Sequence, residues 1–179
     1  MSQLRRTIIL LALLIGTGAP VKALAADPPV PEITLRDADG ADLAALVAKH
    51  RGSVVLVDCW ATWCAECKHQ FPHTVELHRK LGPRGLVVVS LSCDDDTEKE
   101  DVLKFLREKQ ATFDNLRSRH GGSEQSFEAF HVKTGALPYY LLYDRQGKLR
   151  EELGTGTRTE GLKPEELDKA VEELLAEAK

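Results

Sequence analysis

From residue 33 onward, short apolar runs alternate with stretches in which apolar residues recur at helical spacing. The runs at 53–58 (SVVLVD) and 85–92 (GLVVVSLS) are rich in β-branched residues, which is typical of strands buried on both faces. A shorter strand is expected at 33–35 and a helix at 43–50. After the first long run, a helical stripe that ends at Gly82-Pro83 contains Phe71, Val75, Leu77, His78 and Leu81. Because the stripe resumes after Pro72, this proline is expected to kink the helix rather than end it.

The second half of the chain continues the alternation and then changes it. Thr97 and Glu100 have the spacing of a capping box, and they precede a helix whose inward face holds Val102, Phe105 and Leu106. A short helix is expected at 123–131, and residues 139–153 predict two strands joined by a turn at 144–147. A last helix opens at Pro164. The pattern predicts an α/β domain of three layers, with parallel strands and a C-terminal antiparallel hairpin in one mixed sheet.

The first 25 residues have the layout of a secretory signal peptide. Arg5 and Arg6 precede an apolar run at 8–15, and Ala23-Leu24-Ala25 suits a cleavage site. The run is shorter than the ~20 residues that span a bilayer, so we expect cleavage and export to the periplasm or an equivalent space. The two arginines also fit a twin-arginine signal. Residues 26–32 (ADPPVPE) are interpreted as a proline-rich linker, and 33–179 as the folded domain.

Composition fits one soluble domain. Cleavage after residue 25 leaves 154 of the 179 residues, and it removes three positive and no negative side chains, which changes the net charge from −4 to −7. An acidic surface argues against nucleic acid as a partner. We expect a soluble monomer.

Cys64 and Cys67 carry the candidate chemistry. They are too close in sequence to close a stabilising disulfide loop, and the ligand spacing of a zinc site is absent. They lie between a predicted strand and a predicted helix, where free amide groups favour a thiolate at Cys64. Cys67, one turn further on, is positioned to attack a mixed disulfide on Cys64. The spacing therefore indicates a reactive dithiol.

The chain resembles the thioredoxin superfamily, and within it the exported TlpA/ResA-like thiol–disulfide reductases. The resemblance covers residue 33 to the C-terminus. It is carried by Val57-Asp58, by Trp60-Ala61-Thr62-Trp63-Cys64 through Cys67, by Phe71-Pro72, and by Gly135-Ala136-Leu137-Pro138. It implies a thioredoxin-like fold. A peroxiredoxin motif, in which Pro-x3-Thr-x2-Cys carries a lone nucleophile, is absent from the sequence.

The resemblance also implies a role for each matching residue. Cys64 matches the nucleophile and Cys67 the resolving cysteine, and Asp58 matches a buried acid that helps to deprotonate the resolving thiol. Pro138 matches a proline with a cis bond beside the active site, which leaves the backbone of Leu137 free to pair with a substrate chain. Trp63 and Leu137 are accordingly the expected substrate-binding residues.

Two positions depart from the family pattern, and both concern tuning of the site. Gln70 stands where relatives often carry a glutamate, and Cys59 stands where they usually carry an aromatic or aliphatic residue. Gln70 cannot take a proton, so any acid–base role of that position is lost or passes to Asp58 or Glu66. A carboxylate at Glu66 opposes a thiolate at Cys64 and raises its pKa, which favours a reducing couple. Lys68 and His69 act in the opposite direction.

Cys59 and Cys93 end two neighbouring predicted strands. Parallel neighbours usually hold their Cβ atoms farther apart than the ~3.8 Å of a disulfide. We therefore favour two free, buried thiols over a second disulfide.

The predicted activity is reduction of disulfides in exported proteins, apocytochrome c among them, by dithiol–disulfide exchange. No cofactor is required, and the resemblance implies a membrane-bound thiol donor that re-reduces the protein. Two alternatives stay open. One is a copper metallochaperone that uses Cys64, Cys67 and the nearby His69 and His73; the other is a disulfide-forming oxidant of the same fold.

Overall fold

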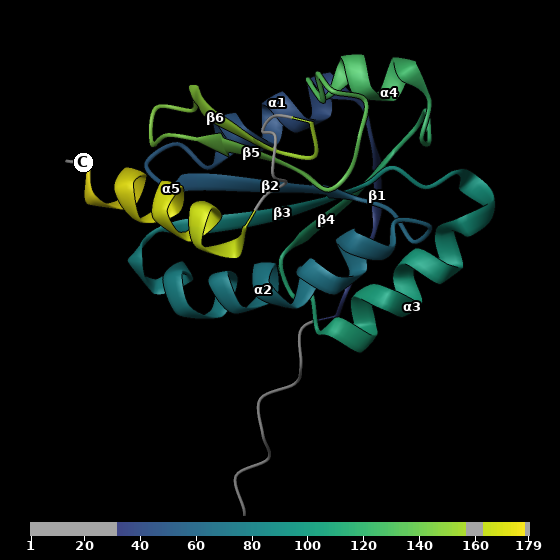
Figure 1. Ribbon diagram of the computed structural model, residues 1–179, viewed down its shortest axis with the longest axis horizontal. Helices are drawn as coiled ribbons and strands as arrows, with labels where there is room; N and C mark the ends of the chain where they lie inside the picture. Colours follow the sequence, from purple (N-terminus) through teal and green to yellow (C-terminus); the bar gives the residue numbers. More distant parts are fainter. Residues whose placement is uncertain (1–31, 157–162, 178–179) are drawn as a thin grey trace, which may run out of the picture. The chain divides into compact units, whose positions relative to one another are not determined.

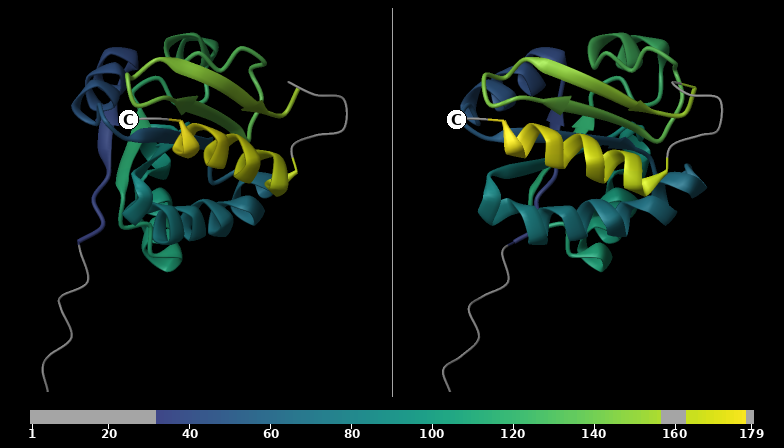
Figure 2. Two further views of the ribbon diagram at one scale, coloured as in Figure 1. Left: turned by 90° about the vertical axis from the view of Figure 1, so that its left-hand side faces the viewer. Right: turned by 60° about the vertical axis from the view of Figure 1, so that its left-hand side comes forward.

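The computed structural model describes residues 32–156 and 163–177, which form a mixed six-stranded sheet with helices on both faces (Figures 1 and 2). The strands are β1 (Arg36–Ala38), β2 (Val54–Trp60), β3 (Leu86–Ser92), β4 (Asp114–Ser118), β5 (Tyr139–Tyr143) and β6 (Leu149–Gly154). The helices are α1 (Gly40–Lys49), α2 (Ala65–Leu81), α3 (Lys99–Lys109), α4 (Glu124–Ala129) and α5 (Pro164–Ala176), with 3-10 turns at Gly82–Arg84 and Asp96–Glu98.

The strand order is β1-β4-β3-β2-β5-β6. The first four of these strands run parallel to one another, whereas β5 pairs antiparallel with both β2 and β6. The predicted mixed sheet with its C-terminal hairpin is confirmed.

The predicted signal peptide, 1–25, and all of the linker except Glu32 lie outside the described residues. Within the part of the chain that the structure describes, no helix is long and apolar enough to cross a membrane.

Strand β2 lies at the centre of the sheet, and all seven of its residues are buried. Its side chains alternate between the two faces, as the period of two requires. Val55, Val57 and Cys59 pack with α1 and with Phe130 beyond α4. Val54 and Leu56 pack with α2 and α5 on the opposite face, where Trp60 meets α2 and α3. Asp58 is two residues from both Leu56 and Trp60, so its side chain lies on the same face of the sheet, toward the α2 layer.

Helix α2 begins directly after Cys64 and continues through Pro72 to Leu81, as the apolar stripe predicted. Phe71 is fully buried at the centre of an aromatic group, with ring centroids 4.9 Å from Trp60, 5.2 Å from Phe105 and 6.2 Å from Phe113. This group fixes the first turns of α2 against β2 and α3.

Two local predictions were wrong, and one strand was missed. The first strand is at Arg36–Ala38 rather than 33–35, because Ile33 and Leu35 pack against the core while the next three residues pair with β4. The capping box before α3 uses Asp95 and Glu98, not Thr97 and Glu100. Strand β4 was not predicted at all, because its sequence, DNLRS, buries polar side chains that have partners.

We expect Phe71→Ala to lower the free energy of unfolding by about 3–5 kcal/mol, because it leaves a cavity among three aromatic rings. Chemical denaturation measures this loss. Glu76→Ala, an exposed position on the same helix, is the control and should change stability by less than about 0.5 kcal/mol. Equal losses in the two variants would contradict the role of Phe71 in the packing.

Candidate active site

Cys64 and Cys67 form a disulfide at the start of α2, with an S–S distance of 2.03 Å. Cys64 is the N-cap residue, and its Sγ accepts a hydrogen bond from the Cys67 backbone N–H at 3.1 Å. Cys64 is 9% exposed and Cys67 only 2%. An incoming disulfide therefore reaches Cys64 first, while Cys67 can attack only from within.

The start of α2 also supplies favourable electrostatics. The N–H groups of a first helical turn have no partner within the helix, and the helix dipole places partial positive charge there. In the reduced protein these groups stabilise a thiolate on Cys64, which is the attacking form of a thiol. The predicted position of Cys64, between a strand and the start of a helix, is confirmed.

Pro138 follows a cis peptide bond with Leu137, in the segment that leads into β5. The Leu137 carbonyl accepts a hydrogen bond from the Thr155 hydroxyl at 3.1 Å. That carbonyl is therefore not wholly free, contrary to the expectation. The Leu137 N–H has no hydrogen-bond partner among the described residues.

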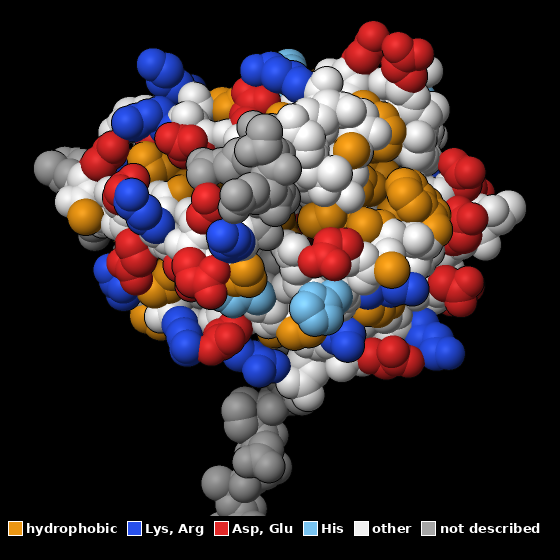
Figure 3. Space-filling model, in the orientation of Figure 1, with side chains coloured by type: hydrophobic (Ala, Val, Ile, Leu, Met, Phe, Trp, Pro, Cys, Tyr) orange, Lys and Arg blue, Asp and Glu red, His pale blue; other side chains and the backbone are white. Residues whose placement is uncertain are grey.

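Trp63 is 57% exposed, and it is the one large hydrophobic side chain that the described residues expose in this way. Its ring lies beside Gly122, where an added Cβ would be 3.2 Å from the ring. Phe127 and Leu137 are partly buried against the cluster that holds both cysteines. Hydrophobic side chains gather among acidic ones on the α3 and α4 side of the molecule (Figure 3, right).

Asp58 is buried with 2% exposure on the α2 face of β2. Burial raises the pKa of its carboxyl to about 7, and a hydrogen bond from the Thr74 hydroxyl, at 2.6 Å, only partly opposes this shift. The predicted burial of Asp58 is therefore confirmed. A carboxyl with such a pKa exchanges its proton near neutral pH.

Glu66 and Gln70 lie one turn apart on the outer side of α2. The Gln70 amide N–H donates to Glu66 Oε1 at 2.7 Å, and Gln70 Oε1 accepts from the Tyr140 hydroxyl at 3.2 Å. The Glu66 side chain is exposed and lies 3.9 Å from His69 Nδ1. Glu66 is thus a solvated charge close to Cys64.

Asp94 is a residue of this site that the sequence analysis missed. It is fully buried after β3, and its two carboxylate oxygens accept the Thr62 N–H at 3.0 Å each. The hydroxyls of Thr62 and Ser92 also donate to it, at 2.5 and 2.7 Å. Asp94 therefore fixes the loop that carries Trp63 and Cys64. The sequence signal that could have identified Asp94 was its position directly after β3, the strand that neighbours β2.

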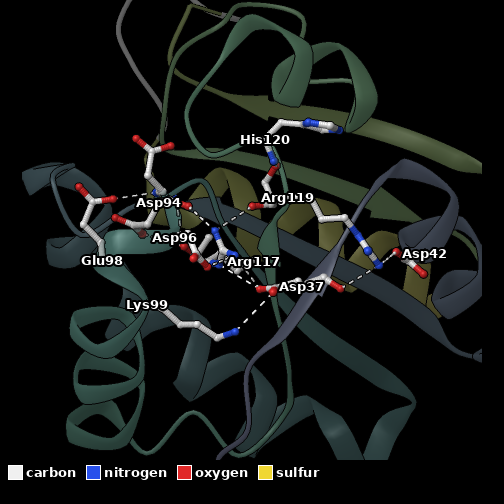
Figure 4. Close-up of polar contacts among 12 residues, drawn as sticks. Asp37, Asp42, Asp94, Asp96, Glu98, Lys99, Arg117, Arg119 and His120 are labelled. Carbon is white, nitrogen blue, oxygen red and sulfur yellow. Dashed lines mark hydrogen bonds and ion pairs between the residues drawn. The ribbon is translucent and has the colours of Figure 1, made fainter.

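Arg117 on β4 holds the segment after β3 that contains Asp94 and Asp96 (Figure 4). Its side chain is buried and donates to the Asp94 carbonyl at 3.3 Å. It also forms ion pairs at 2.9 Å with Asp37 on β1 and with Asp96. One guanidinium thereby joins the edge strand, the sheet and the segment after β3.

Cys59 and Cys93 are free and buried, as predicted. Burial raises the pKa of the Cys93 thiol to about 12, and burial, followed by the neighbouring Cys93, raises the pKa of Cys59 well above its ordinary value. Both remain protonated near neutral pH, so neither is a nucleophile.

His69 and His73, the histidines of the copper hypothesis, turn to carboxylates. His73 Nε2 lies 2.7 Å from Asp168 on α5, and His69 lies near Glu66. Across residues 32–156 and 163–177, no three His, Cys, Asp or Glu side chains are grouped to hold a metal ion. These contacts do not favour copper binding.

Comparison with known proteins places the chain among thioredoxin-like proteins. It is 29% identical over 162 residues to the thiol-disulfide oxidoreductase ResA of Geobacillus thermodenitrificans, covering 86% of this chain and 87% of that protein. The Bacillus subtilis ResA is 25% identical over 165 residues, with 88% and 87% covered. A crystal structure of a Chlorobium tepidum protein assigned as a thiol:disulfide interchange protein DsbE superposes with a TM-score of 0.57. It is 27% identical and covers 73% of this chain and 85% of that one.

The fold that was predicted from the resemblance is thus confirmed by a solved structure. A model of the AhpC/TSA family matches residues 27–152, which include both cysteines, Asp58 and Pro138. With this match over most of its length and a thioredoxin-like sheet, the chain belongs to the AhpC/TSA family.

Proposed function

We propose that this protein is an exported thiol–disulfide reductase that acts on disulfides in other exported proteins. The broader class, thiol–disulfide oxidoreductase, follows from the Cys64–Cys67 pair on a thioredoxin-like fold and from relatives that carry that name. The observation that carries the proposal is the position of this disulfide at the start of α2, with Cys64 more accessible than Cys67.

The reaction begins from the reduced protein. The Cys64 thiolate attacks one sulfur of a partner disulfide, so a mixed disulfide forms and the partner's other sulfur leaves. Cys67 passes its proton to Asp58 and attacks Cys64, which releases the second partner sulfur as a thiolate. Two electrons pass from the dithiol to the partner, and no cofactor takes part.

Export, substrate and electron donor complete the proposal. The signal-like segment 1–25 supports export to the periplasm or an equivalent space. Apocytochrome c is one exported disulfide protein that fits as substrate, and a membrane-bound thiol donor would restore the dithiol. The exposed Trp63 and the N–H of Leu137 support binding of an extended partner segment beside Cys64.

Cysteine variants test the mechanism. Cys64→Ser should abolish reduction of insulin by dithiothreitol-recycled protein, because no nucleophile remains at the surface. Cys67→Ser should accumulate a mixed disulfide that is visible on a non-reducing gel. Normal insulin reduction by Cys64→Ser would reject this mechanism.

The direction of the reaction is a separate prediction. Equilibration with glutathione or dithiothreitol should give a potential well below the ~−120 mV of a strong oxidant such as DsbA. Glu66→Gln should raise the potential by about 10 mV, since a solvated charge beside the thiolate contributes little. Glu76→Gln, further along α2, is the matched control and should leave it unchanged. A potential near −120 mV would instead identify an oxidant.

Asp58→Asn tests the acid–base role. The variant should slow the decay of the mixed disulfide between pH 6 and 8 and remove its pH dependence, while the first attack by Cys64 stays largely intact. Rapid-mixing kinetics of both steps provide the measurement. An unchanged decay across this range would leave Asp58 with a structural role.

The same variant makes a prediction about stability. Folding raises the pKa of Asp58 from 3.8 to about 7. The contribution of this group to folding stability is therefore fully present below pH 4, and this stability is lost as pH rises through 7. Asp58→Asn should therefore be more stable than the native protein by about 4 kcal/mol at pH 8, and about equal at pH 4. Urea denaturation at both values checks this, and a pH-independent difference would contradict it.

A further inference from the structure

Asp58 is not an isolated buried acid, because a chain of polar side chains leads from it to the surface. The Thr74 hydroxyl donates to Asp58 Oδ2 at 2.6 Å. The Tyr140 hydroxyl donates to Gln70 Oε1 at 3.2 Å, and the neighbouring Thr74 hydroxyl acts on the pKa of Tyr140, which places the two hydroxyls close together. Gln70 in turn donates to the exposed Glu66 at 2.7 Å.

The fold brings these groups together from three elements. Asp58 and Tyr140 are directly opposite each other in the antiparallel pair of β2 and β5. Directly opposed side chains lie close together on one face of a sheet, and this face is covered by α2, which supplies Thr74. Thr74 is fully buried and Tyr140 is 2% exposed. Both hydroxyls occupy positions where apolar side chains would pack without any hydrogen-bond requirement.

A hydroxyl both donates and accepts one hydrogen bond, so a pair of hydroxyls can reverse its direction. When Asp58 is ionised, Thr74 donates to it and Tyr140 can donate to Thr74. When Asp58 is protonated, the carboxyl can donate to Thr74, Thr74 to Tyr140, and Tyr140 to Gln70. In each arrangement both hydroxyls have an acceptor for their proton.

We propose that Thr74 and Tyr140 are positioning residues that form a reversible hydroxyl chain, which holds both protonation states of Asp58 and connects it with the surface at Gln70. This inference rests on the proposed function, since it assigns the path of the proton that Cys67 loses. It also explains the glutamine at this position: Gln70 holds no proton itself, and its amide oxygen directs the Tyr140 hydroxyl outward.

The proton balance closes with water alone. Cys67 gives its proton to Asp58 as the Cys64–Cys67 bond forms and the bond from Cys64 to the partner sulfur breaks. Asp58 then donates to Thr74, Thr74 passes its own proton to Tyr140, and Tyr140 passes its own to solvent beside Gln70. One proton leaves along the chain for each disulfide reduced, and the departing partner thiolate is protonated by water.

Other ionisable groups near Asp58 are few. Cys59, on the same strand, interacts with it electrostatically, but its own burial keeps it neutral. On α2, His73 turns away to Asp168 on α5, and β3 places the uncharged Ser90 opposite Asp58. Tyr140 is likewise kept neutral by burial, so the groups left to influence the titration of Asp58 by their charge are Glu66 and Cys67 in its reduced form.

The test follows two steps in a single turnover. The fully reduced protein is mixed with 5,5′-dithiobis(2-nitrobenzoate) in a stopped-flow instrument from pH 5 to 9. The first thionitrobenzoate released reports attack by Cys64, and the second reports resolution by Cys67. Thr74→Val should move the pH midpoint of the second step upward by about one unit, since the ionised carboxyl loses its donor. Resolution should then be roughly tenfold slower at pH 6.

Tyr140→Phe should move the pH midpoint of the second step upward by several tenths of a unit. The second step should then be two- to threefold slower at pH 6. The first step should not change in either variant. Thr74→Ser, which keeps the hydroxyl, should retain the native profile. Tyr139→Phe is the matched control, because this neighbouring hydroxyl points to the opposite face and donates to Glu152 at 2.8 Å.

A Tyr140→Phe profile that superimposes on the native one would overturn the proposal, as would an equal shift in Tyr139→Phe. The pH profile of the second step in the native protein should contain a titration that is lost in Asp58→Asn. The absence of such a titration would overturn the proposal as well. Failure of the proposed function has a different signature: the native protein would then lack the two Cys64-dependent phases altogether.

Discussion

The burial of β2 on both faces, between β3 and β5, is the constraint on which the active site depends. Because side chains alternate along this strand, one residue of register decides that Asp58 enters the α2 layer while Cys59 enters the α1 layer. The same register brings Ser90 and Tyr140 opposite Asp58. The strand then ends at Trp60, and four residues later the chain caps α2 with Cys64. A slip of one residue would turn Cys59 toward α2 and Asp58 toward the α1 layer.

Asp58 and Asp94 are both buried, and their surroundings give the two carboxyls different roles. Asp94 accepts hydrogen bonds from the Thr62 amide and from two hydroxyls, so its oxygens are well satisfied and the loop they hold is fixed. Asp58 has a single donor to its carboxyl in Thr74, and its pKa is correspondingly raised to about 7 by burial. Asp94 thus anchors the loop through its hydrogen bonds, whereas the raised pKa of Asp58 lets that carboxyl exchange a proton near neutral pH.

Much of this architecture could be predicted from the sequence, because apolar periodicity and the cysteine motif reflect burial and chemistry directly. The long strands, α2 with its internal Pro72, the hairpin and the two free thiols all followed from such local signals. Strand β4 did not, because Asn115 and Arg117 are buried through specific partners on other elements rather than through apolar character. Asp94 and Tyr140 were missed for a related reason. Each acts through a residue distant in sequence, and only the sheet register brings the pairs together.

The edges of the sheet have a consequence for association with other chains. Strand β1 has three residues and is tied down by Arg117, whereas β6 carries Arg150, Glu151 and Glu152 and pairs irregularly near Tyr143. Short, charged or irregular edges discourage the addition of a foreign strand. Both edges of the sheet therefore offer poor docking to an extended chain, whereas the Leu137 N–H has no hydrogen-bond partner among the described residues. The sheet thus offers a neighbouring chain little template for self-propagating strand addition.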